Sequence, residues 1–254
     1  MPAVLARRST GWSVAVAALA AAGALVARAG DLPDTQWLDL ESRIQYGYYT
    51  EDVRALEQVA DGLEDDTSGA PLRSYYLGLA RFRLAQLEGA HHAGQAKQSA
   101  DRCVASLESA AQRPEDAAEA LALQSACYRL LAQLKPVSAP YSSLRAGNAM
   151  HRALALAPQD PRVLLLEALE DYDLHHESRA VIGELQKSVA VFERERESVE
   201  RPPSWGAAEA YAFLGRSLLE QGDAIAARGA LEHALLLVPD FAYAHRLMAR
   251  ITAG

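Results

Sequence analysis

Residues 208–241, AEAYAFLGRSLLEQGDAIAARGALEHALLLVPDF, carry the pattern that most restricts the fold of this chain. Tyr211, Leu214 and Leu218 lie at i, i+3 and i+7, so their side chains form one apolar stripe along a helix. The segment EQGD then predicts a turn, and a second stripe of small and apolar residues follows until Pro239 ends it. This window therefore predicts two helices packed antiparallel as a hairpin.

Similar pieces occur earlier in the chain at a spacing that locates an insertion. The segment RALALAP ends at Pro158 much as HALLLVP ends at Pro239, 81 residues later. Two units of 34 residues account for 68 of these positions, so about 13 residues are extra. The extra residues fall around SVERPPSWG, and we place an insert at 193–206, before the last hairpin.

Composition and periodicity together predict an all-α fold. The chain has 254 residues, only 7% of them aromatic, and it is rich in alanine and leucine, which favour helices. Runs of strand-favouring residues are scarce. Helical segments recur in pairs from about residue 34, and DFAYAHRLMARITAG forms one last helix. We expect a solenoid of about five antiparallel helix pairs plus a C-terminal capping helix, forming one domain over residues 30–254.

The best unit closely resembles the tetratricopeptide repeat. It has the 34-residue length of that family, and residues of the permitted type stand at eight signature positions. These are Tyr211, Leu214, Gly215, Leu218, Ala227, Leu231, Ala234 and Pro239. The resemblance is strong over 208–241, fair over 142–171 and weaker in the remainder of residues 34–254. Leu77-Gly78 repeats the Leu214-Gly215 pair, and the small residues would let the paired helices approach closely.

The resemblance implies a function and a ligand face. Tetratricopeptide arrays bind proteins or peptides on a concave wall made by the first helix of each pair, without covalent chemistry. Carried onto this chain, the corresponding candidates are Tyr75, Phe82, Arg83, Tyr128, Arg162, Tyr172, Glu209, Arg216 and Glu220. Aromatic and arginine side chains are common where binding energy is concentrated. The alternative for Tyr75 and Tyr172 is that they pack between repeats.

The sequence contains no recognisable catalytic motif. G-x-S-x-G, a Walker loop, H-E-x-x-H and the Rossmann glycine pattern are all missing from it. We therefore expect no enzyme activity, no cofactor and no metal site. The alternative to a peptide-binding scaffold is a small-molecule binder or an accessory subunit of a transporter or enzyme. Such a protein should have a closed apolar pocket near the irregular segments 135–140 and 200–205.

The N-terminus is typical of an exported protein. Arg7 and Arg8 precede residues 11–27, which carry no charge, and the small-residue exit ARA follows at 27–29. We expect residues 1–29 to be a cleaved signal peptide, giving a periplasmic or otherwise exported protein. The alternative is an uncleaved inner-membrane anchor at 11–27. Cleavage would change the net charge from −8 to −11, which disfavours nucleic acid as a partner.

Cys103 and Cys127 are the two cysteines of the chain. Cys103 stands late in the second helix of one predicted pair, and Cys127 stands late in the first helix of the next pair. A turn near Arg113-Pro114 separates the two helices. At the helical rise of about 1.5 Å per residue the two cysteines lie at comparable distances from this turn. An even number of cysteines in an exported protein favours a disulfide. Two separately buried thiols are the alternative.

Overall fold

The computed structural model describes residues 34–67, 70, 72–89, 92–175, 178–196 and 202–253. These residues form eleven α-helices and one short 3-10 helix, without a β-strand among them. Within the same ranges, no helix is long and apolar enough to cross a membrane. The expected signal peptide at 1–29, and the alternative anchor at 11–27, fall outside the described residues.

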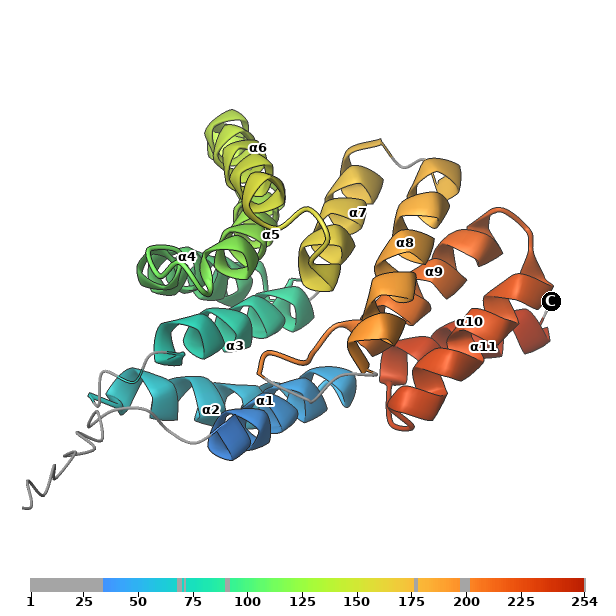
Figure 1. Cartoon of the computed structure of the whole chain (residues 1–254), viewed down its shortest axis with the longest axis horizontal. Coiled ribbons are helices and arrows are strands. Elements are labelled where there is room, and N and C mark those ends of the chain that lie inside the picture. The colour runs from blue at the N-terminus through green and yellow to red at the C-terminus, as the bar shows by residue number, and fades with distance from the viewer. Residues whose placement is uncertain are drawn as a thin grey trace, which may run out of the picture.

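The helices form five consecutive pairs followed by a single helix (Figure 1). The pairs are α1 (Asp34–Tyr49) with α2 (Val53–Asp65), α3 (Arg73–Glu88) with α4 (Ala93–Ala110), α5 (Ala117–Leu134) with α6 (Ala139–Leu156), α7 (Pro161–His175) with α8 (Ser178–Arg196), and α9 (Ala207–Glu220) with α10 (Ala224–Leu237), and the last helix is α11 (Ala242–Ala253). The 3-10 helix Pro136–Ser138 lies between α5 and α6. The predicted all-α solenoid of five helix pairs and a C-terminal helix is confirmed for the described residues. Below, α1, α3, α5, α7, α9 and α11 are the front helices, and the others are the back helices.

Two glycines allow close contact within the helix pairs. A Cβ atom at Gly78 would lie 2.5 Å from the Cγ atom of Leu107 in α4. At Gly215 it would lie 2.7 Å from the Cγ atom of Leu231 in α10. Both distances are shorter than real carbon contacts, so a larger residue would push the helices apart. The repeated Leu-Gly pairs in the sequence therefore mark the positions where front and back helices approach most closely.

The turn inside the last pair follows from its sequence. Gly222 has a φ of 82°, a left-handed conformation that glycine adopts without strain. The Asp223 side chain then accepts a hydrogen bond of 3.0 Å from the backbone N–H of Ala226, which caps the start of α10. The segment EQGD thus ends α9 and begins α10 within a few residues.

The array curves until its last helices contact its first pair (Figure 1). The rings of Tyr49 and Phe241 meet edge to face, with centroids 4.7 Å apart. Nearby, the Arg246 guanidinium forms an ion pair with Glu51 at 2.5 Å. Helix α11 was expected only to cap the array, but it also helps to join the two ends of the molecule.

The described part of the insert, residues 202–206, runs along the inner side of the front helices (Figure 1). Ser204 contacts Glu41 of α1, and Trp205 contacts Tyr75 of α3. The Pro203 carbonyl accepts a hydrogen bond from Arg162 of α7. The insert therefore connects three front helices that lie far apart in the sequence.

Candidate functional site

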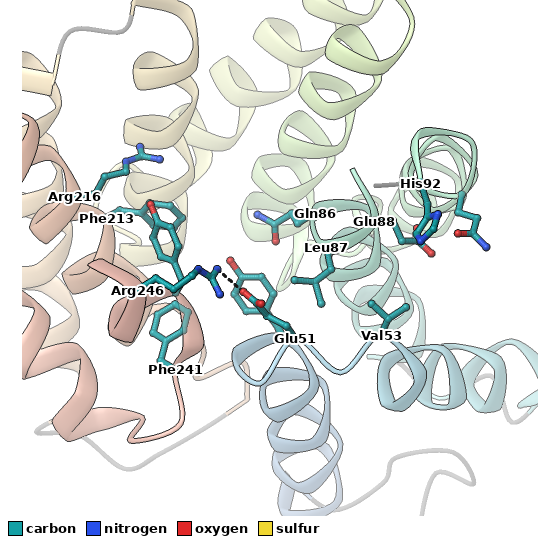
Figure 2. A pocket seen from close by; sticks show the side chains of 13 residues that line it. Glu51, Val53, Gln86, Leu87, Glu88, His92, Phe213, Arg216, Phe241 and Arg246 are labelled. Atoms are coloured by element: carbon teal, nitrogen blue, oxygen red, sulfur yellow. Dashed lines mark hydrogen bonds and ion pairs between the residues drawn. The ribbon is translucent and has the colours of Figure 1, made fainter. Parts of the chain in front are cut away.

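An open groove of about 800 Å³ lies between the two ends of the array (Figure 2). One wall comes from the end of the chain and includes Phe213 and Arg216 of α9 with Phe241, Tyr243 and Arg246 at α11. The opposite wall comes from the first two pairs and includes Tyr48, Glu51, Gln86 and His92. This cavity is called the groove below. It exists because the array closes on itself, so neither wall alone would form it.

Aromatic rings line much of the groove. The Phe213 and Tyr243 rings have centroids 5.6 Å apart, and those of Phe241 and Tyr243 are 6.2 Å apart. Tyr48 joins them from the opposite wall, with its ring centroid 6.3 Å from that of Phe241. Burial raises the pKa of the Tyr48 hydroxyl to about 12, so this group stays protonated and neutral. The rings give the groove a largely aromatic lining.

Arg216 contributes a guanidinium group to this surface. Its guanidinium lies over the Tyr172 ring at 3.8 Å from the centroid, and its Nε atom is 3.9 Å from Glu220. The latter distance is too long for a hydrogen bond. The Nε atom is buried and finds no acceptor in the described part of the chain. The Arg216 side chain as a whole is 18% exposed and lines the groove, so a ligand there contacts the accessible part of its guanidinium.

A smaller hollow of about 160 Å³ continues the groove towards α5 and α7. The two cavities share Gln86, Phe213 and Arg216 in their linings. Arg129 of α5 and Glu170 of α7 lie in the hollow and form an ion pair at 2.5 Å. The groove and this side hollow together extend along the inner surface of the front helices α3, α5, α7 and α9.

Six of the nine predicted concave-face residues are buried, each 7% exposed or less, namely Tyr75, Phe82, Arg83, Tyr128, Arg162 and Glu209. Phe82 still lines the bottom of the side hollow. The other five are held by contacts within the chain and lie outside both linings. In this conformation these side chains are buried, and their role in binding a partner stays a prediction. For Tyr75 the alternative of packing between repeats describes the structure.

The insert explains why Tyr75 and Arg162 are buried. The Trp205 indole Nε1 donates to the Tyr75 hydroxyl at 2.8 Å, and that hydroxyl donates to Glu119 at 2.9 Å. Arg162 donates to Glu195 at 3.0 and 3.1 Å as well as to the Pro203 carbonyl. Burial raises the pKa of Glu119 to about 8, although the charge of Arg162 acts in the opposite direction.

A second fixed contact of the insert is with α1. The Ser204 backbone N–H donates to Glu41 at 2.9 Å, and its hydroxyl donates to the same carboxylate at 2.6 Å. The Tyr76 hydroxyl adds a third hydrogen bond at 2.9 Å. Burial still raises the pKa of Glu41, because three donors do not replace full hydration of the carboxylate. The chain thus uses its own insert where an external ligand was expected.

Closure of the array explains why Arg83 and Glu209 are buried. These two side chains form an ion pair between α3 and α9. Tyr49 of α1 donates to the Glu209 carboxylate at 2.6 Å, and Gln45 donates to it at 3.3 Å. The guanidinium of Arg83 also lies 4.0 Å from the Tyr48 ring centroid, beneath the groove. This network joins the first, second and fifth pairs.

The remaining three predicted residues do come together. Tyr172 donates to the Glu220 carboxylate at 2.9 and 3.0 Å, and its ring carries the guanidinium of Arg216. Arg216 lines both the groove and the side hollow. Tyr172 and Glu220 thus orient Arg216 from outside the two linings, at the edge of the groove.

The sequence contained a signal for groove residues that the prediction missed. Phe213 with Arg216, and Tyr243 with Arg246, each place an aromatic residue three positions before an arginine on a front helix. Residues at this spacing share one face of a helix. Tyr243 and Arg246 were not considered because the last helix was expected only to cap the array.

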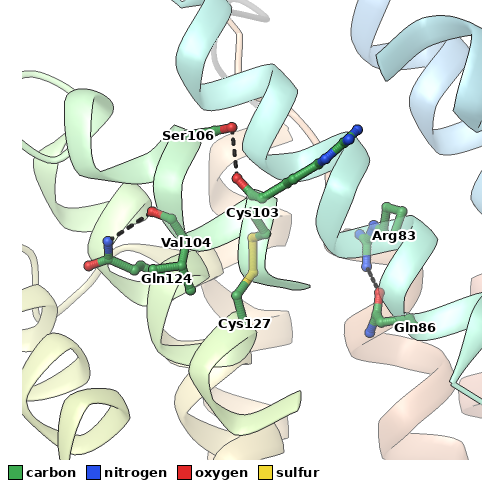
Figure 3. Close-up of a disulfide and its surroundings, with 8 residues drawn as sticks. Arg83, Gln86, Cys103, Val104, Ser106, Gln124 and Cys127 are labelled. Atoms are coloured by element: carbon green, nitrogen blue, oxygen red, sulfur yellow. Dashed lines mark hydrogen bonds between the residues drawn. A yellow bond between two sulfur atoms is a disulfide. The ribbon is translucent and has the colours of Figure 1, made fainter. Parts of the chain in front are cut away.

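A disulfide joins Cys103 of α4 to Cys127 of α5 (Figure 3). Both cysteines are buried, and their Cα atoms are 6.3 Å apart. Close by, the Gln124 side chain donates to the Val104 carbonyl at 3.3 Å, so α4 and α5 are also linked by a hydrogen bond. A disulfide that closes a 24-residue separation contributes on the order of 3 kcal/mol to stability.

The described residues offer no group of three or more His, Cys, Asp or Glu side chains that could hold a metal ion. His92 lines the groove, while His91 lies outside the described ranges.

Comparisons with known proteins give matches in structure only. No family model matches the chain, and no curated protein matches its sequence. One similar solved structure is the "Crystal structure of APC/C hetero-tetramer Cut9-Hcn1", with 14% identity, a TM-score of 0.39, and coverage of 84% of this chain and 42% of that chain. Another is the "Assembly Chaperone of RpL4 (Acl4) (Residues 1-338)", with 12% identity, a TM-score of 0.42, and coverage of 87% and 96%. This chain spans less than half of the first of these chains, and the likeness concerns helical architecture alone.

Proposed function

We propose that this protein is a non-catalytic scaffold that binds an extended peptide segment of a partner protein in the groove. The observation that supports this best is the continuous inner surface formed by the groove and the side hollow. It combines aromatic rings with arginine side chains, which together favour peptide side chains and backbone carbonyls. Its length along several front helices suits a chain better than a compact small molecule.

The proposed mode of binding follows from the groove residues. Apolar side chains of the peptide pack against Phe213 and Tyr243, which are half-buried. A peptide carbonyl or carboxylate accepts a hydrogen bond from the half-buried Arg216 guanidinium, which lines the groove. Because the walls belong to opposite ends of the array, a bound peptide also links these ends. Binding should therefore stabilise the closed array.

A small-molecule binder or an accessory subunit remains the weaker proposal. The closed apolar pocket of such a protein was expected near the segments 135–140 and 200–205. In the second of these, Trp205 is buried against Tyr75 and itself occupies the inner surface. The groove lies elsewhere, and its lining includes several charged side chains.

We further propose that the protein is exported to the cell envelope after cleavage of residues 1–29. The disulfide between Cys103 and Cys127 supports this proposal, because such bonds persist in oxidising compartments. The negative net charge supports a protein partner over a nucleic acid. N-terminal sequencing of the secreted protein should start near Gly30, and the unreduced protein should contain no titratable thiol. Two titratable thiols, or an intact N-terminus on a membrane-bound protein, would contradict this.

Binding of peptides selected from a displayed random library tests the proposed function. We expect Phe213→Ala and Arg216→Ala to weaken the selected peptides about tenfold or more, measured by fluorescence anisotropy. Ile225→Ala is the matched control, since Ile225 is an exposed apolar residue of α10 outside the groove. Equal affinities for all three variants and the wild type would reject the groove as the binding site.

A further inference from the structure

Exposed apolar residues gather on α6 and the 3-10 helix before it. Val137, Tyr141, Leu144 and Leu156 are 101%, 62%, 63% and 60% exposed. The other large exposed apolar residues of the described chain, Tyr46, Leu174, Ile225 and Leu236, are spread over three other helices. Helix α6 packs chiefly against α5 and touches α7 only slightly, so it projects from the array (Figure 1). Within the described ranges, one side of α6 therefore has no partner.

Basic and amide side chains lie between these apolar residues. Arg145, Asn148 and Arg152 stand at i, i+3 and i+7 and share one stripe of α6, with His151 beside them. They line a hollow of about 390 Å³, completed by Gln124, Tyr128 and Ala149. No carboxylate belongs to the lining, although the chain as a whole has a net charge of −8. The hollow is thus a local cationic site on an acidic protein.

These cations are only partly engaged within the chain. Arg145 donates to the Tyr128 hydroxyl at 3.2 and 3.3 Å, and Glu108 of α4 is the acidic group whose charge acts on it. Arg152 makes no ion pair or hydrogen bond of its side chain to any other described residue. Both arginines keep free N–H donors, which favour carboxylates with paired oxygen acceptors.

We propose that this surface, called the α6 face (Val137, Tyr141, Leu144, Arg145, Asn148, Arg152 and Leu156), binds an acidic amphipathic segment of a partner protein. Carboxylates of the segment pair with Arg145 and Arg152, while its apolar side chains cover Tyr141, Leu144 and Leu156. The 18 residues of α6 span about 27 Å, which matches a helical segment of similar length. None of these residues lines the groove, so the proposal is independent of peptide binding there.

A protein segment fits the α6 face better than an anionic membrane does. The donors lie in a concave hollow, which a side chain enters more easily than a flat lipid surface. A membrane would also face the charge of −8 over a wide area of the protein. A short segment experiences mainly the charges within a Debye length of about 8 Å. The lining of the hollow contains two arginines and no carboxylate.

Binding to a defined probe tests the proposal. The probe is a fluorescent 18-residue helical peptide of leucine and glutamate, and its partner probe carries lysine in place of glutamate. We expect the full-length protein to bind the glutamate peptide at about 50 mM salt and to ignore the lysine peptide. The double variant Arg145→Glu/Arg152→Glu should weaken binding about tenfold or more. Leu144→Ser, which changes no charge, should weaken it less.

The matched control is Arg54→Glu/Arg228→Glu, which makes the same change in net charge at exposed arginines of α2 and α10. This control should keep wild-type affinity, and circular dichroism should show that both double variants remain folded. Equal weakening in both would overturn the proposal, because only net charge would matter. Failure to bind the glutamate peptide would overturn it too. A third outcome is that the protein binds phosphatidylglycerol vesicles but not the peptide, and that Arg145→Glu/Arg152→Glu abolishes vesicle binding. In that case the α6 face would be a membrane-binding surface, and the proposal of a protein segment would be wrong.

Discussion

Two regions of the inner surface contain the same kinds of residue but differ in what occupies them. Around the insert, Tyr75 and Arg162 are buried by Trp205 and the Pro203 carbonyl. In the groove, Phe213 and Arg216 are only half-buried, and no other segment of the described chain covers them as the insert covers Tyr75 and Arg162. In the first region the chain supplies its own ligand. In the second region the corresponding place is open.

The difference separates stability from recognition. Most polar groups around the insert have internal hydrogen-bond partners, the Nε atom of Arg162 being an exception among the described residues. Removing one partner leaves a buried group unsatisfied, which costs stability. Phe213 and Arg216 are less buried than the residues around the insert. We therefore expect substitutions at these two positions to reduce the affinity for a peptide more than they reduce stability. Aromatic and arginine side chains on a front helix therefore do not identify a binding site by themselves. Such side chains can contact a partner only where no other part of the chain covers them.

The largest effect on stability is expected at the ion pair that closes the array. Glu209→Ala leaves the buried Arg83 guanidinium without its carboxylate, so we expect the free energy of unfolding to fall by about 4 kcal/mol. Urea unfolding measures this change. The double variant Arg83→Met/Glu209→Leu should lose less than Glu209→Ala, since it leaves no charge unpaired. A loss below about 1 kcal/mol for Glu209→Ala would show that the ends of the array are not joined in this way.

A matched pair of aromatic truncations compares the two regions directly. Trp205→Ala removes a buried ring and its hydrogen bond to Tyr75, with an expected loss of about 3 kcal/mol. Phe213→Ala removes a half-buried ring and should cost about 1 kcal/mol. Thermal unfolding of both variants provides the measurement. Equal losses would remove the distinction between the filled region and the open one.

A smaller effect is expected from pH. The pKa of Glu119 in the folded protein is raised to about 8, whereas an exposed glutamate has a pKa of about 4.3. Between these values the folded protein binds more protons than the unfolded chain, so the free energy of unfolding falls as pH rises. The raised pKa of Glu41 acts in the same direction.

We expect the wild type to lose at least about 1 kcal/mol of stability between pH 5 and pH 8. Glu119→Gln should reduce this loss, because glutamine does not titrate, while Glu115→Gln is the control at an exposed carboxylate. Stability that rises with pH over this range, or an unchanged slope in Glu119→Gln, would contradict the assignment.

Local sequence patterns were sufficient to predict the helix pairs. Apolar spacing and turn residues located the helices, and the Leu-Gly pairs at Gly78 and Gly215 marked the close contacts. The ligand face was harder, because burial of Glu209 depends on Gln45 and Tyr49, which are 164 and 160 residues away. No repeat pattern contains such contacts. Closure of the array and the path of the insert decide which front-helix residues stay accessible.

Site-specific photocrosslinking tests the groove most directly. A benzoylphenylalanine placed at Tyr48 or at Tyr243 would face the groove from its opposite walls, and one at Tyr141 would stand on the α6 face as a control. With a peptide selected from a random library, we expect crosslinks from both groove positions and none from Tyr141. Crosslinks from Tyr141 alone, or from neither groove position, would contradict peptide binding between the two ends of the array.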